Sequence, residues 1–316
     1  MRAVQVRRFG GPDVLVTTEV PEPVAGPGQV VIGVAVADTL FLETQLRTGW
    51  GSDVFGLEPP YVPGTGVAGR VLSAGEGVDP GLLGREVVAG VTGGGYADKV
   101  AALAESVFEI PAGLGLREAA ALQQIGPAAL NVLDAAEIAP GERVLVTAAG
   151  GGLGSLLVQL AKAAGARVVA AAGSARKLRL AGELGADDVL DYSTSDWTAT
   201  LDDVDVVFDG AGGQVGLDAF ARTARKGRFF AYGIPGGNFA GIDPAAAEER
   251  DIRVSGIELL QFSPEQIQRL VPRTLAAGAA GLVKPVIGQT FPLTRAADAH
   301  TAIESREAIG KTLLLI

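Results

Sequence analysis

The segment Arg143–Gly154, with the sequence RVLVTAAGGGLG, constrains the fold more than any other part of the chain. The apolar run Arg143–Ala148 predicts a buried strand, and Gly150–Gly152 predict a tight turn. The apolar residues of Leu153–Ala164 then recur at helical spacing. A strand, a glycine-rich turn and a helix in this order are typical of a dinucleotide-binding unit.

The turn predicts a phosphate site made of backbone groups. Glycines let the main chain approach a pyrophosphate, and the N–H groups and dipole of a helix N-terminus stabilise its negative charge. In the fingerprint the chain has Ala149 at the first position, where glycine is commoner. The alternative is an ordinary apolar strand and turn of an α/β protein. The residues expected at this site are Ala149, Gly150, Gly151, Gly152 and Leu153.

The end of the next predicted strand, Arg167–Ala172, indicates which nucleotide binds. An NAD-binding protein usually has Asp or Glu about 20 residues after the fingerprint, to hold the ribose 2′-hydroxyl. Here Gly173 and Ser174 follow Ala172, so no carboxylate repels a 2′-phosphate. Ser174 can donate a hydrogen bond, and Arg176 and Lys177 come next. We predict NADP(H), although the two basic residues could belong to an ordinary solvated helix face.

Composition limits the class of protein. The chain has 316 residues, of which 48% are hydrophobic, so two domains with ample core are expected. No apolar run approaches the length of a membrane span and no signal core is present near Met1, which predicts a soluble, cytoplasmic protein. The net charge of −10 argues against nucleic acid or an anionic membrane as partner. Without cysteine and with His300 as the only histidine, disulfides, thiolate catalysis and ordinary zinc sites are essentially excluded.

The pattern of the chain changes near residue 122. Residues 1–122 contain short β-rich runs separated by Gly and Pro, which is typical of a small, irregular β-barrel. Residues 123–264 alternate strand and helix, which predicts an α/β domain with a doubly wound parallel sheet of Rossmann type. Residues 265–316 end in β structure, so we expect them to rejoin the first domain. The apolar segment Ile252–Leu260 predicts an edge strand that could pair with a second copy, and hence a homodimer.

Segments spread over nearly the whole chain carry a family resemblance. They are FGGPDVL (Phe9–Leu15), LRTG (Leu46–Gly49), PPYVPGTGVAGRVLSAGEGV (Pro59–Val78), VTAAGGGLGSLLVQLAKAAGA (Val146–Ala166), ELGADDVLDY (Glu183–Tyr192), VVFDGAGG (Val206–Gly213) and AHTAIESREAIGKTLLL (Ala299–Leu315). As a set they resemble the medium-chain dehydrogenase/reductase superfamily and, within it, the zinc-free quinone oxidoreductase (zeta-crystallin-like) group.

This resemblance implies a GroES-like catalytic domain split around a Rossmann domain, with the cofactor in the cleft. It also implies that Ser174, Lys177 and Tyr192 hold the 2′-phosphate end of the adenosine. Tyr192 could instead be a strand-end aromatic that packs. Gly233 and Ile234 would lie near the nicotinamide.

The chain departs from the family pattern at several positions. Zinc alcohol dehydrogenases of this superfamily carry a His–Glu pair after Pro-Gly, whereas Thr65 and Gly66 stand here, so we predict no metal site. An Asn that quinone oxidoreductases place near the nicotinamide corresponds to Leu40, and the following Asp to Glu43. Polar donors on the substrate side are therefore fewer.

The expected reaction is hydride donation from NADPH to a quinone or to the β-carbon of an enone, which needs no metal to polarise an alcohol. The candidate acceptor-side residues are Leu40, Trp50, Tyr61 and Gln124. Aromatic faces suit a planar acceptor, although they could simply pack the loop, and Gln124 could stabilise a developing oxyanion. No side chain is assigned as proton donor, so catalytic residues remain unknown.

Three other ionisable residues are expected to have structural roles. We expect His300 to be a packed or capping histidine, and Glu43 and Asp38 to be surface or structural carboxylates. The alternative function is an NADPH-binding redox sensor or structural protein with little or no turnover.

Overall fold

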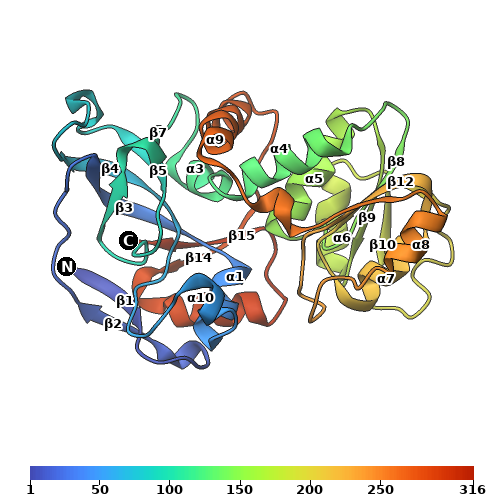
Figure 1. Cartoon of the computed structure of the whole chain (residues 1–316), viewed down its shortest axis with the longest axis horizontal. Coiled ribbons are helices and arrows are strands. Elements are labelled where there is room, and N and C mark those ends of the chain that lie inside the picture. Colours follow the sequence, from blue (N-terminus) through green and yellow to red (C-terminus); the bar gives the residue numbers. More distant parts are fainter. The chain divides into compact units, whose positions relative to one another are not determined.

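The computed structural model describes residues 1–316 and divides into two compact units. The first unit consists of Met1–Gln124 and Ile267–Ile316, and the second of Ile125–Gln266. Figure 1 shows the elements of both units along the chain.

The second unit is built on a parallel sheet of six strands in the order β10-β9-β8-β11-β12-β13. The change of direction in strand order lies between β8 and β11, where ligands bind in open α/β sheets. This topology confirms the predicted Rossmann-type sheet. The strands are β8 (Arg143–Val146), β9 (Arg167–Ala172), β10 (Asp188–Asp191), β11 (Val204–Asp209), β12 (Thr223–Ala231) and β13 (Arg253–Ser255), and the helices are α4 (Ile125–Ala136), α5 (Gly152–Ala163), α6 (Ala175–Glu183), α7 (Gly213–Ala221) and α8 (Pro244–Glu249).

The core of the second unit lies between this sheet and its helices. The strand β8 buries Val144, Leu145 and Val146 completely, as expected for a central parallel strand. From α5, Leu156 and Leu157 are also fully buried, so one face of this helix packs on the protein interior.

The edge strand of the second unit is shorter than the sequence predicts. Only Arg253–Ser255 pairs with β12, and Ile257–Leu260 forms a 3₁₀ helix, so the strand prediction over Ile252–Leu260 is wrong for its second half. Local turn chemistry explains the difference. The Gly256 N–H donates to a Glu258 carboxylate oxygen at 2.7 Å, and the Leu259 N–H donates to the Gly256 carbonyl.

The first unit contains a mixed sheet of seven strands and a separate two-stranded sheet of β1 and β2. The path through the larger sheet is β14-β15-β3-β4-β5-β7, and β6 also pairs with β3. This separate β-rich unit agrees with the predicted irregular β domain. The strands are β1 (Arg2–Val6), β2 (Leu15–Glu19), β3 (Gln29–Thr39), β4 (Gly66–Ala74), β5 (Glu86–Gly90), β6 (Lys99–Leu103), β7 (Val107–Glu109), β14 (Ile287–Pro292) and β15 (Lys311–Leu315).

The tail of the chain is part of the first unit. The strand β15 pairs antiparallel with β3 in the register Leu313↔Asp38, and Figure 1 shows these red and blue strands together. Small residues of α3, Ala119–Ala121, pack in one core cluster with Val271 and Leu275 of α9. The helices of this unit are α1 (Phe41–Thr48), α2 (Ser52–Phe55), α3 (Leu116–Leu122), α9 (Pro264–Ala279), which begins just before the unit boundary, and α10 (Ala296–Glu304). None of the helices in either unit combines the length and apolar composition needed to cross a membrane.

Gly154 controls how closely α5 approaches the end of β8. A Cβ at this position would lie 2.5 Å from the Ala148 carbonyl oxygen and 3.0 Å from the Ala149 Cα. Because both neighbours are main-chain atoms, no side-chain rotation relieves the overlap.

Gly154→Ala is therefore expected to destabilise the protein by about 1 to 3 kcal/mol through overpacking. The matched control is Gly182→Ala in α6, where nothing lies within 4 Å of the added Cβ. That change should be neutral or stabilising by about 0.5 to 1 kcal/mol because alanine favours the helix. Urea denaturation of the three proteins measures both effects, and equal stabilities would contradict the proposed close approach.

Candidate functional site

The loop between β8 and α5 has the geometry of an anion cradle. Ala148 adopts a positive φ of 50°, and the Gly151 N–H donates to the Ala148 carbonyl oxygen at 2.9 Å. The first-turn N–H groups of α5, from Gly152 to Gly154, have no carbonyl acceptor one turn earlier in the helix. Main-chain donors at a helix N-terminus suit a phosphate.

The residues expected at the adenosine end lie around this loop. A Cβ at Gly150 would lie 2.6 Å from both Cβ and Cγ of Lys177, so the lysine stem packs over the loop. A Cβ at Gly173 would lie 2.9 Å from the Tyr192 ring, so this glycine leaves space for the aromatic side chain. The structure thus brings Gly150, Gly173, Lys177 and Tyr192 to the carboxyl ends of β8, β9 and β10.

Ser174 is the N-cap residue of α6. Its Oγ accepts a long hydrogen bond of 3.5 Å from the Lys177 N–H, so its own proton is not used in this bond. The nearby Asp191 carboxylate accepts the Ser193 N–H at 2.9 Å, and hydrogen bonding by Ser193 lowers the pKa of Asp191. Tyr192 packs edge-to-face on Trp197, with ring centroids 6.3 Å apart. Tyr192 therefore packs as a strand-end aromatic and also lies beside Gly173.

Thr147 and Asp209 form a buried pair that the sequence analysis did not assign to the site. The Thr147 hydroxyl donates to the Asp209 carboxylate at 2.7 Å and accepts the Gly210 and Ala211 N–H groups. The same carboxylate accepts the Ala211 and Gly212 N–H groups, each at 3.1 Å. Burial raises the pKa of Asp209, and these donors oppose that change. The pair fixes the loop after β11, and the motif VVFDGAGG was its only signal in the sequence.

The residues expected near the nicotinamide follow β12. A Cβ at Gly233 would lie 2.0 Å from the Gly210 carbonyl oxygen, so only glycine fits there. The Gly233 N–H donates to the Asp209 carbonyl oxygen at 3.2 Å, and the Ile234 carbonyl accepts the Gly237 N–H. Gly233 therefore lies against the loop that Thr147 and Asp209 hold.

In the first unit a buried carboxylate lies at the centre of a polar network. Glu43 is only 4% exposed and its carboxylate accepts four hydrogen bonds. The donors are the Leu40 N–H at 3.1 Å, the Thr65 N–H at 3.0 Å, the Thr65 hydroxyl at 3.3 Å and the Tyr96 hydroxyl at 2.8 Å. Burial raises the pKa of Glu43, whereas the donors counteract it. The Glu43 carboxylate therefore links Leu40 to Thr65, and Thr65 is itself hydrogen-bonded to Gln124.

Gln124 joins this network through Thr65. Its Nε2 donates to the Thr65 Oγ1 at 2.9 Å. A Cβ at Gly66 would lie 2.6 Å from the Gln123 Oε1 and 2.7 Å from the Gln124 Nε2, so two carboxamides fill the space of a side chain at position 66. No group of three or more His, Asp or Glu residues is arranged to hold a metal ion.

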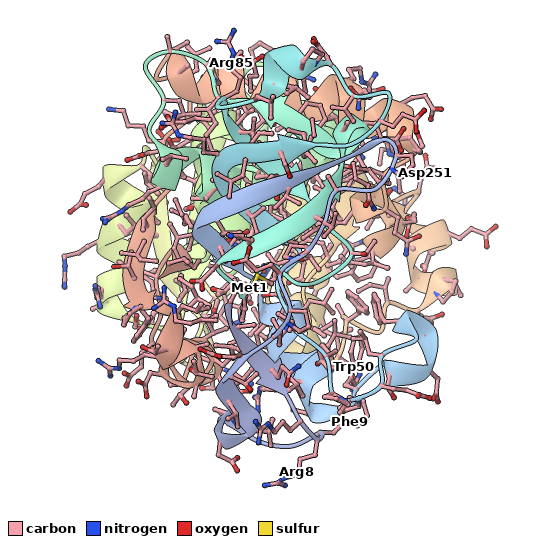
Figure 2. All side chains as sticks on the ribbon, turned by 90° about the vertical axis from the view of Figure 1, so that its left-hand side faces the viewer. Met1, Arg8, Phe9, Trp50, Arg85 and Asp251 are labelled. Atoms are coloured by element: carbon pink, nitrogen blue, oxygen red, sulfur yellow. The ribbon has the colours of Figure 1, made fainter.

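The other candidate acceptor-side residues have different environments. Trp50 is 49% exposed. The preceding residue, Gly49, packs against Phe9, because a Cβ at Gly49 would lie 3.2 Å from the Phe9 ring, and Figure 2 labels Trp50 and Phe9. Tyr61 is half-buried and forms two backbone hydrogen bonds with Val6, and burial raises the pKa of Tyr61 to about 12. Neither side chain is hydrogen-bonded to the Glu43 network. The structure therefore joins Leu40 with Gln124 but not with Trp50 or Tyr61.

His300 and Asp38 are both buried. The His300 Nε2 lies 3.1 Å from the Tyr96 hydroxyl oxygen, and its Nδ1 has no partner. Burial, together with the Arg47 charge, lowers the pKa of His300 to about 3. Asp38 pairs with Lys311 at 2.7 Å, and burial raises the pKa of Asp38 to about 7. The sequence predicts Asp38 and Glu43 to be surface or structural carboxylates. Both are buried, so only the structural role fits.

The chain is similar to known oxidoreductases over nearly its whole length. A family model described as zinc-binding dehydrogenase matches residues 184–314. The chain is 32% identical to a quinone oxidoreductase of Rattus norvegicus, with 100% of this chain and 98% of that protein covered. It is 30% identical to a 2-haloacrylate reductase of a Burkholderia species, with 99% and 98% covered. The structure of Escherichia coli quinone oxidoreductase complexed with NADPH has a TM-score of 0.91, 26% sequence identity and 100% of both chains covered.

The buried His300 predicts a specific acid sensitivity. The unfolded chain binds a proton at His300 below about pH 6.5, whereas the folded protein binds it only below about pH 3, so this residue reduces stability as pH falls through that interval. Between pH 6 and pH 4 the loss of unfolding free energy is expected to be about 2 to 3 kcal/mol smaller in His300→Gln than in the wild type. Urea denaturation at several pH values measures this difference. Parallel pH profiles would show that the histidine is not buried in its neutral form.

Proposed function

Because the chain belongs to the quinone oxidoreductase group of the medium-chain dehydrogenase/reductase superfamily, we propose that it is an NADPH-dependent oxidoreductase. Its acceptor would be a quinone or an α,β-unsaturated carbonyl compound. The observation that carries the proposal is the packing of Lys177 over Gly150 beside a strand end, Ala172–Ser174, that has no carboxylate. This arrangement suits a 2′-phosphate close to a backbone pyrophosphate site.

The second unit would bind the cofactor. The pyrophosphate would bind at Ala149–Leu153, where the main chain offers its N–H groups. Ser174, Lys177 and Tyr192 would hold the 2′-phosphate end, and Gly233 and Ile234 would lie beside the nicotinamide. When bound, NADPH supplies the hydride. The Thr147–Asp209 pair would keep the neighbouring loop in place through the hydrogen bonds described above.

The positions of Leu40, Thr65 and Gly66 do not fit a catalytic zinc, and the Glu43 carboxylate that contacts Leu40 and Thr65 already accepts four hydrogen bonds. Leu40, Thr65 and Gly66 offer no thiolate, imidazole or carboxylate, and two glutamine carboxamides fill the adjacent space. The acceptor would contact Leu40, Trp50, Tyr61 and Gln124, with the aromatic rings against a planar molecule. The overall reaction consumes NADPH, one proton and the acceptor, and yields NADP⁺ and the reduced acceptor. The proton would come from solvent.

The acceptor class has support from two kinds of relative. The similar rat protein is a quinone oxidoreductase and the similar Burkholderia protein is a 2-haloacrylate reductase, whose substrate name describes a conjugated alkene. Quinones and conjugated alkenes of this kind are electron-poor, so hydride transfer to them requires less activation by the protein. A sensor or structural protein that binds NADPH without turnover is the second candidate, favoured by the apolar Leu40 at a position where the family resemblance implies an Asn. A cytoplasmic homodimer through the β13 edge remains a prediction.

Lys177→Ala should raise the Kd for NADPH by about tenfold or more, because a charge-assisted contact to phosphate is lost. The Kd for NADH, which has no 2′-phosphate, should change little. Arg179→Ala is the matched control, since this exposed arginine lies on the same helix two residues away. Isothermal titration of the three proteins with both nucleotides measures the effect. Equal affinity of the wild type for NADPH and NADH would contradict the proposed selectivity.

Turnover with an acceptor panel tests the function itself. The purified protein is expected to oxidise NADPH in the presence of a quinone or an enone, without added divalent cation and with EDTA present. Absorbance at the NADPH band measures the rate, and the product formed from an enone identifies the reduced bond. Tight NADPH binding without turnover on any acceptor would favour the sensor. A requirement for zinc would contradict the proposed mechanism.

A further inference from the structure

We propose that Glu43 is a positioning residue that fixes the orientation of the Gln124 carboxamide through the Thr65 hydroxyl. Glu43 would thereby set which polar groups Gln124 presents to the acceptor. The inference rests on the proposed reduction of an acceptor at the first unit. All of its residues belong to that unit.

The direction of the hydrogen bonds follows from the chemistry of the three groups. An ionised carboxylate can only accept, so the Thr65 hydroxyl must donate its single proton to Glu43. The Thr65 oxygen must then accept from Gln124, which places Nε2 of the carboxamide toward Thr65, at 2.9 Å. The Oε1 of Gln124 is therefore turned away from Thr65. If residue 43 could donate, Thr65 could give its proton to the Gln124 oxygen and the amide could turn over.

The opposite side of the network supports an ionised Glu43. The His300 Nδ1 has no hydrogen-bond partner, so a proton there would be a buried donor without an acceptor. The favoured tautomer carries its proton on Nε2 and donates to the Tyr96 oxygen, 3.1 Å away. Tyr96 must then donate to Glu43. Both arms of the network therefore end on the same carboxylate, together with the Leu40 and Thr65 main-chain N–H groups.

The space around Gln124 makes such a constraint necessary. Gly66 has no Cβ, and the carboxamides of Gln123 and Gln124 occupy the volume that a side chain would fill. Rotation of the Gln124 carboxamide about the Cγ–Cδ bond exchanges Oε1 and Nε2. These two atoms are similar in size, so both orientations fit this volume. Steric packing does not distinguish the two orientations, whereas the hydrogen bond from Thr65 to Glu43 does.

Four variants separate this role from general structural support. Glu43→Gln keeps the shape but replaces the obligatory acceptor with a group that can donate, and Thr65→Val removes the hydroxyl with little change in volume. Thr65→Ser retains the hydroxyl and should behave as the wild type. Glu118→Gln is the control, because Glu118 is an exposed carboxylate of α3 in the same unit. Thermal unfolding identifies any variant that does not fold. If Glu43→Gln does not fold, Thr65→Val still tests the hydrogen-bond chain from Glu43 through Thr65 to Gln124.

The first measurement does not need turnover. The side-chain amide signals of ¹⁵N-glutamine-labelled protein are recorded by NMR, and loss of a signal pair in Gln124→Leu assigns Gln124. The wild type and Thr65→Ser should show one Gln124 signal pair with slow water exchange. In Glu43→Gln and Thr65→Val exchange should accelerate on the order of tenfold, as expected when one hydrogen bond is lost. Unchanged exchange in a folded Glu43→Gln variant or in Thr65→Val would overturn the proposal, whether or not the protein is an enzyme.

The second measurement uses the acceptor on which the wild type is most active. Glu43→Gln and Thr65→Val should lower kcat/KM for the acceptor by about tenfold, while the Kd for NADPH changes by less than about twofold. Thr65→Ser should recover activity to within about threefold of the wild type. Equal losses in Thr65→Ser and Thr65→Val would overturn the positioning role. A wild type without turnover would overturn the proposed function alone, because the NMR result still decides the orientation of Gln124.

Discussion

The carboxyl edge of the parallel sheet depends on main-chain contacts that leave no room for a side chain. A Cβ at Gly154, Gly212 or Gly233 would lie 2.5, 2.4 or 2.0 Å from a carbonyl oxygen. Gly154 determines how closely α5 approaches the end of β8, and Gly212 and Gly233 determine how closely the loops after β11 and β12 approach each other. An edge built in this way presents N–H groups rather than side chains, which is the chemistry that an anionic phosphate group requires. The proposed cofactor site therefore follows from close packing of backbone.

The cradle could be predicted from the sequence because its geometry is local. The strand, the turn and the helix are contiguous, and the glycines mark where the backbone must be exposed. The edge strand was harder to predict, since the apolar pattern of Ile252–Leu260 continues where the backbone turns. There, Gly256 and Glu258 form local hydrogen bonds that end the strand after Ser255. A short-range turn prevailed over a favourable strand composition.

The Glu43 network could not be predicted, because its members come from distant parts of the chain. Glu43 and Thr65 are 22 residues apart, and Tyr96 and His300 are 204 residues apart. They meet only after β3, β4 and the C-terminal segment have assembled. In the sequence a lone glutamate is most often a solvated surface group. Its buried position and its four donors become visible only in the folded unit, so the candidate residue Gln124 was found without the groups that hold it.

The network also explains how this unit tolerates a buried carboxylate. Removing Glu43 from water raises the free energy of its ionised form, and the four hydrogen bonds offset part of that increase. Two of the donors are main-chain N–H groups, which cannot reverse their direction, so they favour the carboxylate over a neutral acid. Thr65 and Tyr96 can reverse, and they take their direction from the carboxylate. The charge of Glu43 thus orders the side chains around it, and a proton on that carboxylate would allow Thr65 and Tyr96 to reverse their hydrogen bonds.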